Sequence, residues 1–413
     1  MKRKVTSIVS MIILCAILFS TATSTVAAKE FKMASNPENS LTNNADRITD
    51  LGFTIITVDD LIPEKNVYAD SMNSSLESVL DSNVLFTADA LENCTSFSSE
   101  ISAAIYAGRI VAVYDPIGIS QEFDAMLSMP FISVHNLSDE VTVAEENLEY
   151  IVIGKFYGVD QTGHIKINNI NVLSDLSESE AFEVFYQQLN RFIEKLAINN
   201  DYSETPTVAA ANDYVRIGEE GGYFLGKEKK GAIQQYYEVY MRRNYNGYDY
   251  YAIHARIEEI PGAALDYGDK NYTFHKLTTS IATTEDDAML YKTEPNSNNG
   301  STTYSVNIGL SLDGPSVSIS WERESPDIDI QKTSASNKRC EWTATYKFTS
   351  FADIASSAWT FEPGATIRVP NGTQYVGVAG QSTLSVWKLL QLSSVGATGN
   401  TVFLIDSGKT YPA

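Results

Sequence analysis

The stretch from Thr302 to Trp321 constrains the fold of this chain more than any other. Apolar residues occupy every second position in two short runs, small polar residues fill the gaps, and Asp313-Gly314-Pro315 separates the runs. A period of two places the apolar side chains on one face of a strand, and two such runs around Asp-Gly predict a β-hairpin. The C-terminal half is therefore predicted to be antiparallel β. The apolar positions are Tyr304, Val306, Ile308, Leu310, Leu312, Val317, Ile319 and Trp321.

The first residues have the pattern of a secretory signal peptide. Lys2-Arg3-Lys4 precede an apolar run from Ile8 to Phe19, and Val26-Ala27-Ala28 supplies the small residues of a cleavage site. The run has about 12 residues, whereas a membrane-spanning helix needs roughly 20. We therefore expect residues 1–28 to be removed, the protein to be secreted and extracellular, and the polar stretch 29–47 to form a disordered leader.

Charge and cysteine usage exclude two classes of site. The chain carries 30 Lys and Arg against 52 Asp and Glu, a formal net charge of −22, which repels nucleic acid. We therefore expect no nucleic-acid partner. Cys94 and Cys340 remain after removal of the signal, and the sequence leaves open whether they pair. The cysteines and histidines do not form the closely spaced ligand pairs of a zinc finger.

Residues 48–198 are predicted to form an α/β domain with a largely parallel sheet. Strand-like runs such as Phe53–Val58 and Arg109–Tyr114 alternate with helical patterns such as Phe97–Ala107. Alternation of strand and helix along the chain is typical of parallel sheets with helices on their faces.

Two features close this first domain. Tyr150–Phe156 and His164–Val172 are predicted to form a hairpin at one edge of the sheet. Ser177 and Glu180 have the spacing of a capping box, so a helix is predicted to begin there. An apolar stripe along that helix indicates a buried face. Its residues are Phe182, Phe185, Leu189, Phe192, Ile193 and Leu196.

The composition changes after this helix. Residues 199–212 are rich in Asn, Asp, Ser and Ala and are predicted to form a linker between domains. From residue 213 to 413, roughly ten or more short strands separated by Gly, Pro and Asn turns predict a β-sandwich. The second domain is therefore expected to be all-β.

The motifs that would indicate an enzyme are absent. The sequence has no Gly-x-Ser-x-Gly elbow, no Gly-x-Gly-x-x-Gly loop after the first strand and no His-Glu-x-x-His pair. Four aspartates follow predicted strands of the first domain and could bind a divalent cation such as Ca²⁺. Capping of the next turn is the commoner role of such residues, and no other cofactor is expected. The aspartates are Asp59, Asp60, Asp89 and Asp115.

Tyrosines crowd the hairpin around Asn244-Tyr-Asn-Gly247. A tyrosine offers a rigid apolar face and a hydrogen-bonding tip, which suits glycans and protein surfaces. The strand propensity of tyrosine explains the crowding as well, and alternation places at most half of these side chains on one face. The candidate ligand-binding residues are Tyr237, Tyr245, Tyr248 and Tyr250.

The arm Tyr304–Leu312 has the length of a transmembrane strand. Its apolar side chains would face lipid and its Ser, Asn and Gly residues would face water, with Tyr304 and Trp321 at the interfaces. The pattern resembles the stem hairpin of secreted leukocidin-type pore-forming toxins, and the resemblance implies insertion of the hairpin into a membrane. Glu322-Arg323-Glu324 departs from that pattern. A sandwich hairpin with one buried face explains the same alternation.

The sequence thus favours a secreted, non-catalytic protein that binds an extracellular surface, glycan or protein. The alternative is a membrane-active, pore-forming protein that inserts the hairpin, and a weaker alternative is a secreted enzyme that uses a cation at the acidic strand ends. In the soluble protein the apolar side of the hairpin is expected to be packed, because soluble monomers rarely expose such a patch.

Overall fold

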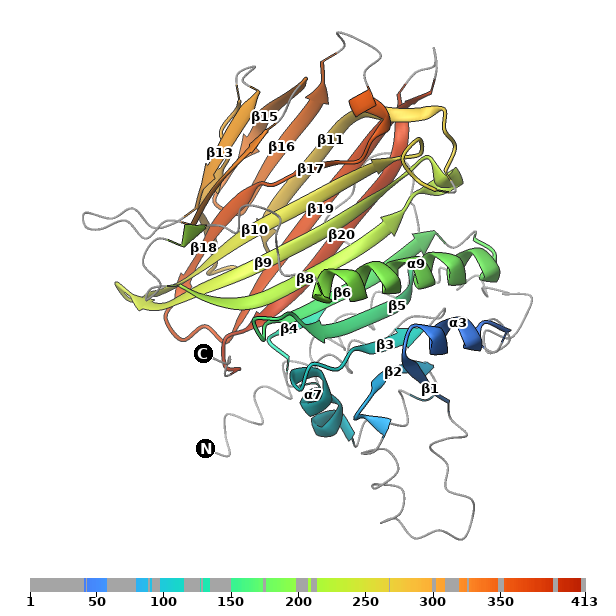
Figure 1. Ribbon diagram of the computed structural model, residues 1–413. Helices are drawn as coiled ribbons and strands as arrows, with labels where there is room; N and C mark the ends of the chain where they lie inside the picture. Colours follow the sequence, from blue (N-terminus) through green and yellow to red (C-terminus); the bar gives the residue numbers. More distant parts are fainter. Residues whose placement is uncertain are drawn as a thin grey trace, which may run out of the picture. The chain divides into compact units, whose positions relative to one another are not determined.

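The computed structural model shows a chain that is mostly β, with a mixed sheet, an antiparallel sheet, a small third sheet and few helices among the described residues (Figure 1). Residues 37–413 belong to one compact unit. The structure describes residues 41, 43–57, 79–87, 90, 97–114, 127, 129–133, 150–173, 176–197, 207–208, 214–266, 268–298, 302–308, 319–324, 327–347, 353–388 and 393–409.

The largest sheet draws strands from both halves of the chain. Its order is β1-β2-β3-β5-β6-β8-β9-β10-β18-β12, and β17 also pairs with β10. The pairs β1–β2, β2–β3 and β6–β8 are parallel, and the other pairs are antiparallel. The strands are β1 (Phe53–Ile56), β2 (Asn83–Thr87), β3 (Val111–Tyr114), β5 (Tyr150–Val159), β6 (Ile165–Leu173), β8 (Val215–Leu225), β9 (Gly231–Tyr245), β10 (Tyr248–Pro261), β12 (Met289–Glu294), β17 (Trp359–Phe361) and β18 (Gly364–Pro370).

The first half of the chain differs from its prediction in two respects. The hairpin β5–β6 lies inside the sheet, between β3 and β8, and not at an edge. Strand β4 (Phe131–Ser133), which lies within the range 48–198 predicted for the first domain, pairs with β20 of the second sheet and not with a strand of this one. The sheet is mixed and not largely parallel, because an inserted hairpin reverses the chain direction and adds antiparallel neighbours.

The second sheet is antiparallel, in the order β15-β16-β11-β19-β20-β4. It packs on what we call the inner face of the large sheet. Gln235 of β9 marks the contact, because it donates to Ser382 Oγ at 2.8 Å and accepts from Thr401 Oγ1 at 2.7 Å. The remaining strands are β11 (Tyr272–Thr283), β15 (Ile328–Ala335), β16 (Arg339–Tyr346), β19 (Tyr375–Lys388) and β20 (Ser394–Asp406).

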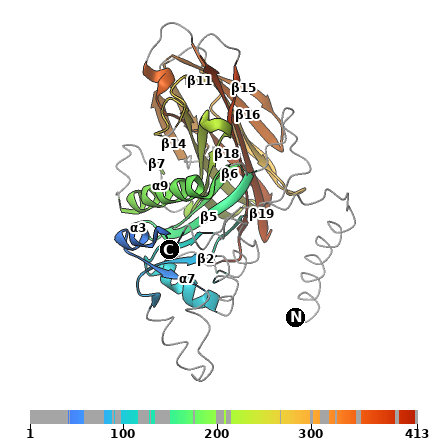
Figure 2. The ribbon, with the colours of Figure 1, turned by 90° about the vertical axis from the view of Figure 1, so that its right-hand side faces the viewer.

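Helix α9 (Glu178–Ala197) lies on the opposite, outer face of the large sheet (Figures 1 and 2). The predicted capping box is present, since Glu180 Oε2 accepts from Ser177 N at 3.1 Å and Ser177 Oγ accepts from Glu180 N at 3.4 Å. The helix can approach β5 closely because Gly154 stands there. A Cβ at that position would lie 2.4 Å from the Phe185 ring. Four stripe residues are buried, and Ile193 and Leu196 are partly buried.

Two further helices belong to the first half of the chain. Helix α7 (Ser98–Tyr106) is followed by Gly108 at a φ of 88°, the left-handed conformation in which many helices end. Helix α3 (Ala45–Asp50) begins inside the stretch expected to be a leader, and its Ile48 is fully buried. No helix among the described residues is long and apolar enough to cross a membrane.

The third sheet holds the hairpin. Strands β13 (Thr303–Asn307) and β14 (Ile319–Glu324) pair with each other, and β7 (Thr207–Val208) pairs with β14. Strand β7 comes from the stretch 199–212 that the sequence predicts as a linker. That stretch therefore contributes a strand to the hairpin sheet. Along the sequence, strands of the large sheet come both before and after it.

Candidate functional site

The predicted hairpin is present. Val306 lies opposite Trp321 and Asn307 lies opposite Ser320, as expected for a turn at Asp313-Gly314. The turn itself lies outside the described residues, as do three of the predicted apolar positions. Those three are Leu310, Leu312 and Val317.

The described part of the hairpin has one buried and one exposed side. Val306, Ile308 and Ile319 are fully buried, and Tyr304 and Trp321 are each 4% exposed. Ser305 and Asn307, at the alternate positions of β13, are exposed. The prediction that the apolar side is packed is confirmed for Val306, Ile308 and Ile319, and Tyr304 and Trp321 are buried beside them.

Side chains attach the hairpin to the outer face of the large sheet. A Cβ built on Gly364 of β18 would lie 2.7 Å from Ile308 Cγ2 and 2.8 Å from the Trp321 ring, so glycine is what permits this approach. Tyr304 packs on Phe361 with ring centroids 5.6 Å apart. In the part of the chain that the structure describes, no strand pairing joins β13 or β14 to the large sheet. The hairpin could therefore leave without breaking that sheet's ladder.

Glu362 attaches the hairpin to the large sheet through polar contacts. Its backbone N–H, its backbone carbonyl and its carboxylate all bind hairpin side chains. Its backbone N–H donates to Tyr304 Oη at 2.9 Å. Its backbone carbonyl accepts from Trp321 Nε1 at 3.1 Å, and its carboxylate accepts from Arg323 Nε at 2.8 Å. Glu362 follows β17 and is 5% exposed. It is thus the polar anchor of the hairpin.

The strand register places a row of charged residues between α9 and the hairpin. Direct cross-strand neighbours on the outer face run from Gly158 under α9, through four charged or titratable residues, to Gly364 under the hairpin. Each of the four is at most 8% exposed. They are Lys166, Glu219, Glu238 and His254.

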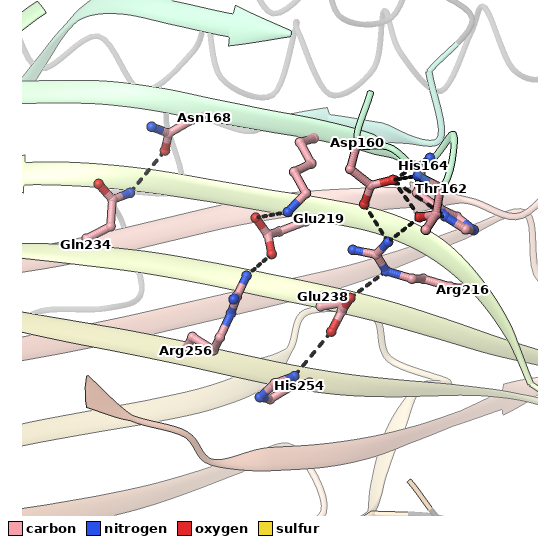
Figure 3. Close-up of polar contacts among 11 residues, drawn as sticks. Asp160, Thr162, His164, Asn168, Arg216, Glu219, Gln234, Glu238, His254 and Arg256 are labelled. Carbon is pink, nitrogen blue, oxygen red and sulfur yellow. Dashed lines mark hydrogen bonds and ion pairs between the residues drawn. The ribbon is translucent and has the colours of Figure 1, made fainter. Parts of the chain in front are cut away.

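Six side chains of alternating sign extend this row into a chain of contacts, which we call the charged chain. Figure 3 shows its members Asp160, Arg216, Glu238 and His254. Arg216 contacts Asp160 at 2.6 Å and also pairs with Glu238. His254 lies between two carboxylates, with Nδ1 3.2 Å from Glu238 Oε2 and Nε2 2.9 Å from Glu362 Oε2. The members, in order, are Asp160, Arg216, Glu238, His254, Glu362 and Arg323.

The charged chain keeps its carboxylates ionised. Burial would raise the pKa of Asp160, but the Arg216 charge and hydrogen bonds from Thr162 lower it to about 2. Burial likewise opposes ionisation of Glu362, and hydrogen bonding to His254 with the Arg323 charge lowers its pKa to about 2. A buried ion pair survives only when each charge is compensated in this way. Loss of any one member should therefore leave a buried, uncompensated charge in the charged chain.

Comparison with known proteins finds matches among solved structures, at low sequence identity and with TM-scores below 0.5. No protein-family model matches this sequence, and no curated protein matches it significantly.

Three of the solved structures to which the chain is similar are described as a pore-forming protein and as two toxins. One is described as "Pore forming protein" (10% identity, 49% of this chain and 96% of that one, TM-score 0.33). Another is Clostridium perfringens delta-toxin (11% identity, 48% and 93%, TM-score 0.34). A third is the Clostridium perfringens NetB toxin in the membrane inserted form (8% identity, 48% and 94%, TM-score 0.26).

The structure separates the predicted tyrosine site into two places. Tyr237 is fully buried on the inner face, with its hydroxyl against Gly380, so it shares no surface with the others. Tyr245 and Tyr250 have ring centroids 6.1 Å apart, and Tyr250 is 5.8 Å from a residue the sequence did not single out, Tyr291 of β12. Tyr237 was assigned to the site because strand alternation does not say which face is core.

Arg368 joins the tyrosines of the strand ends. Its guanidinium lies 4.6 Å from the Tyr248 ring and 5.5 Å from the Tyr291 ring, within the range of cation–π attraction. Tyr248 and Tyr291 are 37% and 41% exposed, whereas Tyr250 is buried. We call Tyr245, Tyr248, Tyr250, Tyr291 and Arg368 the tyrosine cluster.

The predicted cation site lies outside the described part of the chain. Asp59, Asp60, Asp89 and Asp115 all lie outside the described residues. No group of His, Cys, Asp and Glu in the described residues could hold a metal ion. Cys340 is a buried free thiol, and Cys94 lies outside the described residues.

Sequence reasoning missed the charged chain. Glu238 and His254 stand at alternate positions of strands whose other face is apolar, which is also the pattern of a strand with one side in water. The signal that could have found them is the tyrosine content of the same face, since Tyr236 and Tyr240 flank Glu238 and are nearly buried. Large aromatic residues on a strand face that is expected to be exposed to solvent indicate that another part of the protein packs on that face.

Proposed function

We propose that this is a membrane-active, pore-forming protein whose β13–β14 hairpin leaves the large sheet and inserts into a lipid bilayer. The observation that carries the proposal is the hairpin's mode of attachment. It packs as a separate element through side chains, with an apolar side buried and a polar side exposed. That alternation is the one a lipid-facing and water-facing strand needs.

The charged residues of β14 fit this function better than the sequence indicates. Arg323 lies opposite Tyr304 and Glu324 lies opposite Thr303, at the end of the hairpin away from the turn. A hairpin inserts turn first, so these charges stay at the membrane surface and avoid the cost of a charge at the midplane.

Leakage from dye-loaded phosphatidylcholine vesicles tests the proposal. Purified protein is expected to release the dye. A lipid-contact probe then identifies the inserting element: a fluorophore on Ile308→Cys should be quenched by spin-labelled lipid, whereas one on Asn307→Cys should not, because neighbouring residues of a strand face opposite sides. Equal quenching at both positions, or quenching at neither in protein that leaks vesicles, would show that another element inserts.

A second function is favoured by the tyrosine cluster, which we propose contacts an extracellular glycan or protein surface. Exposed tyrosines stacked on one arginine suit such recognition. The cluster also lies beside the described end of β13, because Lys292, next to Tyr291 in the sequence, donates to Asn307 Oδ1 at 3.3 Å. A surface receptor held there would bring the hairpin close to its membrane.

Paired substitutions test the recognition role. Tyr248→Ala and Tyr291→Ala should reduce binding to target cells or to a glycan array, while Tyr375→Ala, which changes a tyrosine of similar exposure (36%), should not. Unchanged binding by the double variant Tyr248→Ala/Tyr291→Ala would remove the cluster from the recognition surface.

A further inference from the structure

The ring of His254 has a carboxylate at each nitrogen. Nδ1 faces Glu238 Oε2 at 3.2 Å and Nε2 faces Glu362 Oε2 at 2.9 Å. A neutral imidazole has only one N–H, so it could donate to only one of them, whereas the imidazolium donates to both. The geometry therefore requires the charged form in the closed protein.

The hairpin itself stabilises that charge. Trp321 lies over the His254 ring with centroids 4.1 Å apart, where an indole attracts a cation. Trp321 also holds the Glu362 carbonyl, so it fixes the residue that supplies the second carboxylate. Removing the hairpin takes away the indole and loosens Glu362, and both changes disfavour the imidazolium.

We propose that His254 is a proton-dependent clamp for the hairpin: the imidazolium holds β13–β14 on the large sheet, and its deprotonation at alkaline pH releases them. The effect of release on membranes rests on the proposed function, but the clamp is a property of the soluble protein. By linkage, if hairpin docking favours protonation, then loss of the proton weakens docking by the same factor.

The charged groups that face His254 keep their charge in the range where His254 titrates, so His254 is the group whose charge changes. Burial opposes the imidazolium, but hydrogen bonds to Glu238 and Glu362 raise the pKa of His254 above 6.5. Despite burial, the pKa of Glu238 is held well below its usual range by Arg216 and His254, and that of Glu219 is lowered to about 2 by Arg256 and Lys166. The neighbouring arginines stay charged throughout. These arginines are Arg216, Arg256 and Arg323.

Lys195 of α9 titrates in the same range and needs a control. Burial, with the Arg256 charge, lowers its pKa to about 7. Its ammonium lies 3.5 Å from the Tyr236 ring, and the nearby charges that act on it most strongly are those of Arg256 and Glu219. Lys195→Gln removes this titration and leaves His254 and its two carboxylates unchanged.

The sign of the effect follows from the raised pKa. The clamp is fully present below pH 6.5 and is lost as pH rises through the raised pKa of His254. The ratio of open to closed hairpin should rise by up to about tenfold per pH unit between the pKa of the open form and that of the closed form, and stay flat outside that window.

Hydrogen exchange of the full chain between pH 6 and 9, without membranes and corrected for intrinsic rates, measures the clamp directly. Peptides over residues 303–308 and 319–324 should exchange faster as pH rises, while peptides of β9 do not. Lys195→Gln should keep this rise. His254→Gln should open at every pH, and His254→Arg, which keeps the charge, should stay closed. A pH response that persists in His254→Gln, or its absence from wild type, overturns the clamp.

Glu362→Gln keeps the test decisive if His254→Gln does not fold. It removes one of the two carboxylates with little change of shape, so the rise in hairpin exchange should move to lower pH. An unmoved midpoint contradicts the clamp. Vesicle leakage separates this proposal from the proposed function: pH-dependent opening without leakage under any condition leaves the clamp and removes the pore, whereas leakage with pH-independent exchange does the reverse.

Discussion

Trp321 lies over His254, with ring centroids 4.1 Å apart and ring planes inclined by 41°. The indole belongs to the hairpin and the imidazole belongs to the large sheet, so this ring contact joins two elements that share no strand pairing in the described residues. The same indole donates to the carbonyl of Glu362. One residue therefore supplies both an aromatic and a polar contact to the surface beneath it.

Replacing this indole should loosen the hairpin and not the whole protein. Trp321→Phe keeps a ring over His254 but leaves the Glu362 carbonyl without its donor, at a cost of about 1–3 kcal/mol. Trp321→Ala removes the ring as well and should cost about 3–5 kcal/mol. Hydrogen exchange should show both losses in residues 303–308 and 319–324.

A second histidine–tryptophan pair provides the control. His275 and Trp387, on β11 and β19, also have ring centroids 4.1 Å apart but lie away from the hairpin. Trp387→Phe should leave hairpin exchange at the wild-type rate. Equal loosening by Trp387→Phe and Trp321→Phe would mean that the measurement reports general softening.

Charge on the two sides of the hairpin arm 303–308 distinguishes a structural hairpin from an inserting one. Ile308→Asp places a charge on the buried side, and Ser305→Asp places the same charge on the exposed side. If the hairpin inserts, Ile308→Asp should abolish vesicle leakage in a protein whose sandwich stays folded, and Ser305→Asp should retain leakage, because that side faces water. Near-ultraviolet circular dichroism checks the fold of each variant.

The opposite pattern has a clear meaning. A hairpin that is only part of a static core would transmit the cost of a buried, unpaired charge to the whole domain. Suppose that Ile308→Asp unfolds cooperatively at lower denaturant and that the wild type does not leak vesicles. This result would support a static sandwich hairpin with one buried face.

A disulfide should hold the hairpin closed. A Cβ at Gly364 would lie 3.1 Å from Cγ1 of Val306, a spacing that disulfide geometry can bridge. Val306→Cys/Gly364→Cys should block leakage when oxidised and regain it when reduced. The single variant Gly364→Cys controls for crowding against Ile308 and Trp321. Leakage by the oxidised double variant, with the bond verified by mass, would contradict release of β13.

The hairpin was predictable because its information is local. Alternation in β13 and the Asp-Gly turn signal give the pairing of Val306 with Trp321, which the structure shows. The helix α9 was predictable for the same reason, since its capping box and stripe lie within 20 residues of chain. Period and turn chemistry act between near neighbours and need no knowledge of the rest of the fold.

The charged chain was not predictable, because its members meet only through the sheet order. Asp160 and Arg323 stand at its two ends and come from different halves of the sequence. In the sequence His254 is an isolated histidine within a strand. No neighbouring residue indicates that Glu238 and Glu362 contact its two ring nitrogens. Pairing of distant strands determines such contacts, and one sequence does not specify that pairing.

The buried stripe of α9 gives a test of packing in the first half of the chain. Leu189 is fully buried, and Leu189→Ala should lower the free energy of unfolding by about 2–5 kcal/mol, as core leucine truncations do. Glu194→Ala on the exposed side of the same helix should change it by less than about 0.5 kcal/mol. Denaturant unfolding of both variants measures the difference, and equal small effects would mean that α9 packs loosely.

Low pH should also weaken the charged chain, because it protonates the carboxylates. Glu362 and Asp160 have pKa values lowered to about 2, so the stability they contribute is present above their ordinary pKa range, near 4, and is lost as pH falls from there toward 2. Each such proton adds about 1.4 kcal/mol per pH unit to the slope of unfolding free energy against pH. Glu362→Gln should remove one proton's share of that slope between pH 2.5 and 4.5. If Glu362→Gln keeps the wild-type slope, then Glu362 is not held ionised by His254 and Arg323, and the charged chain does not contribute as its geometry indicates.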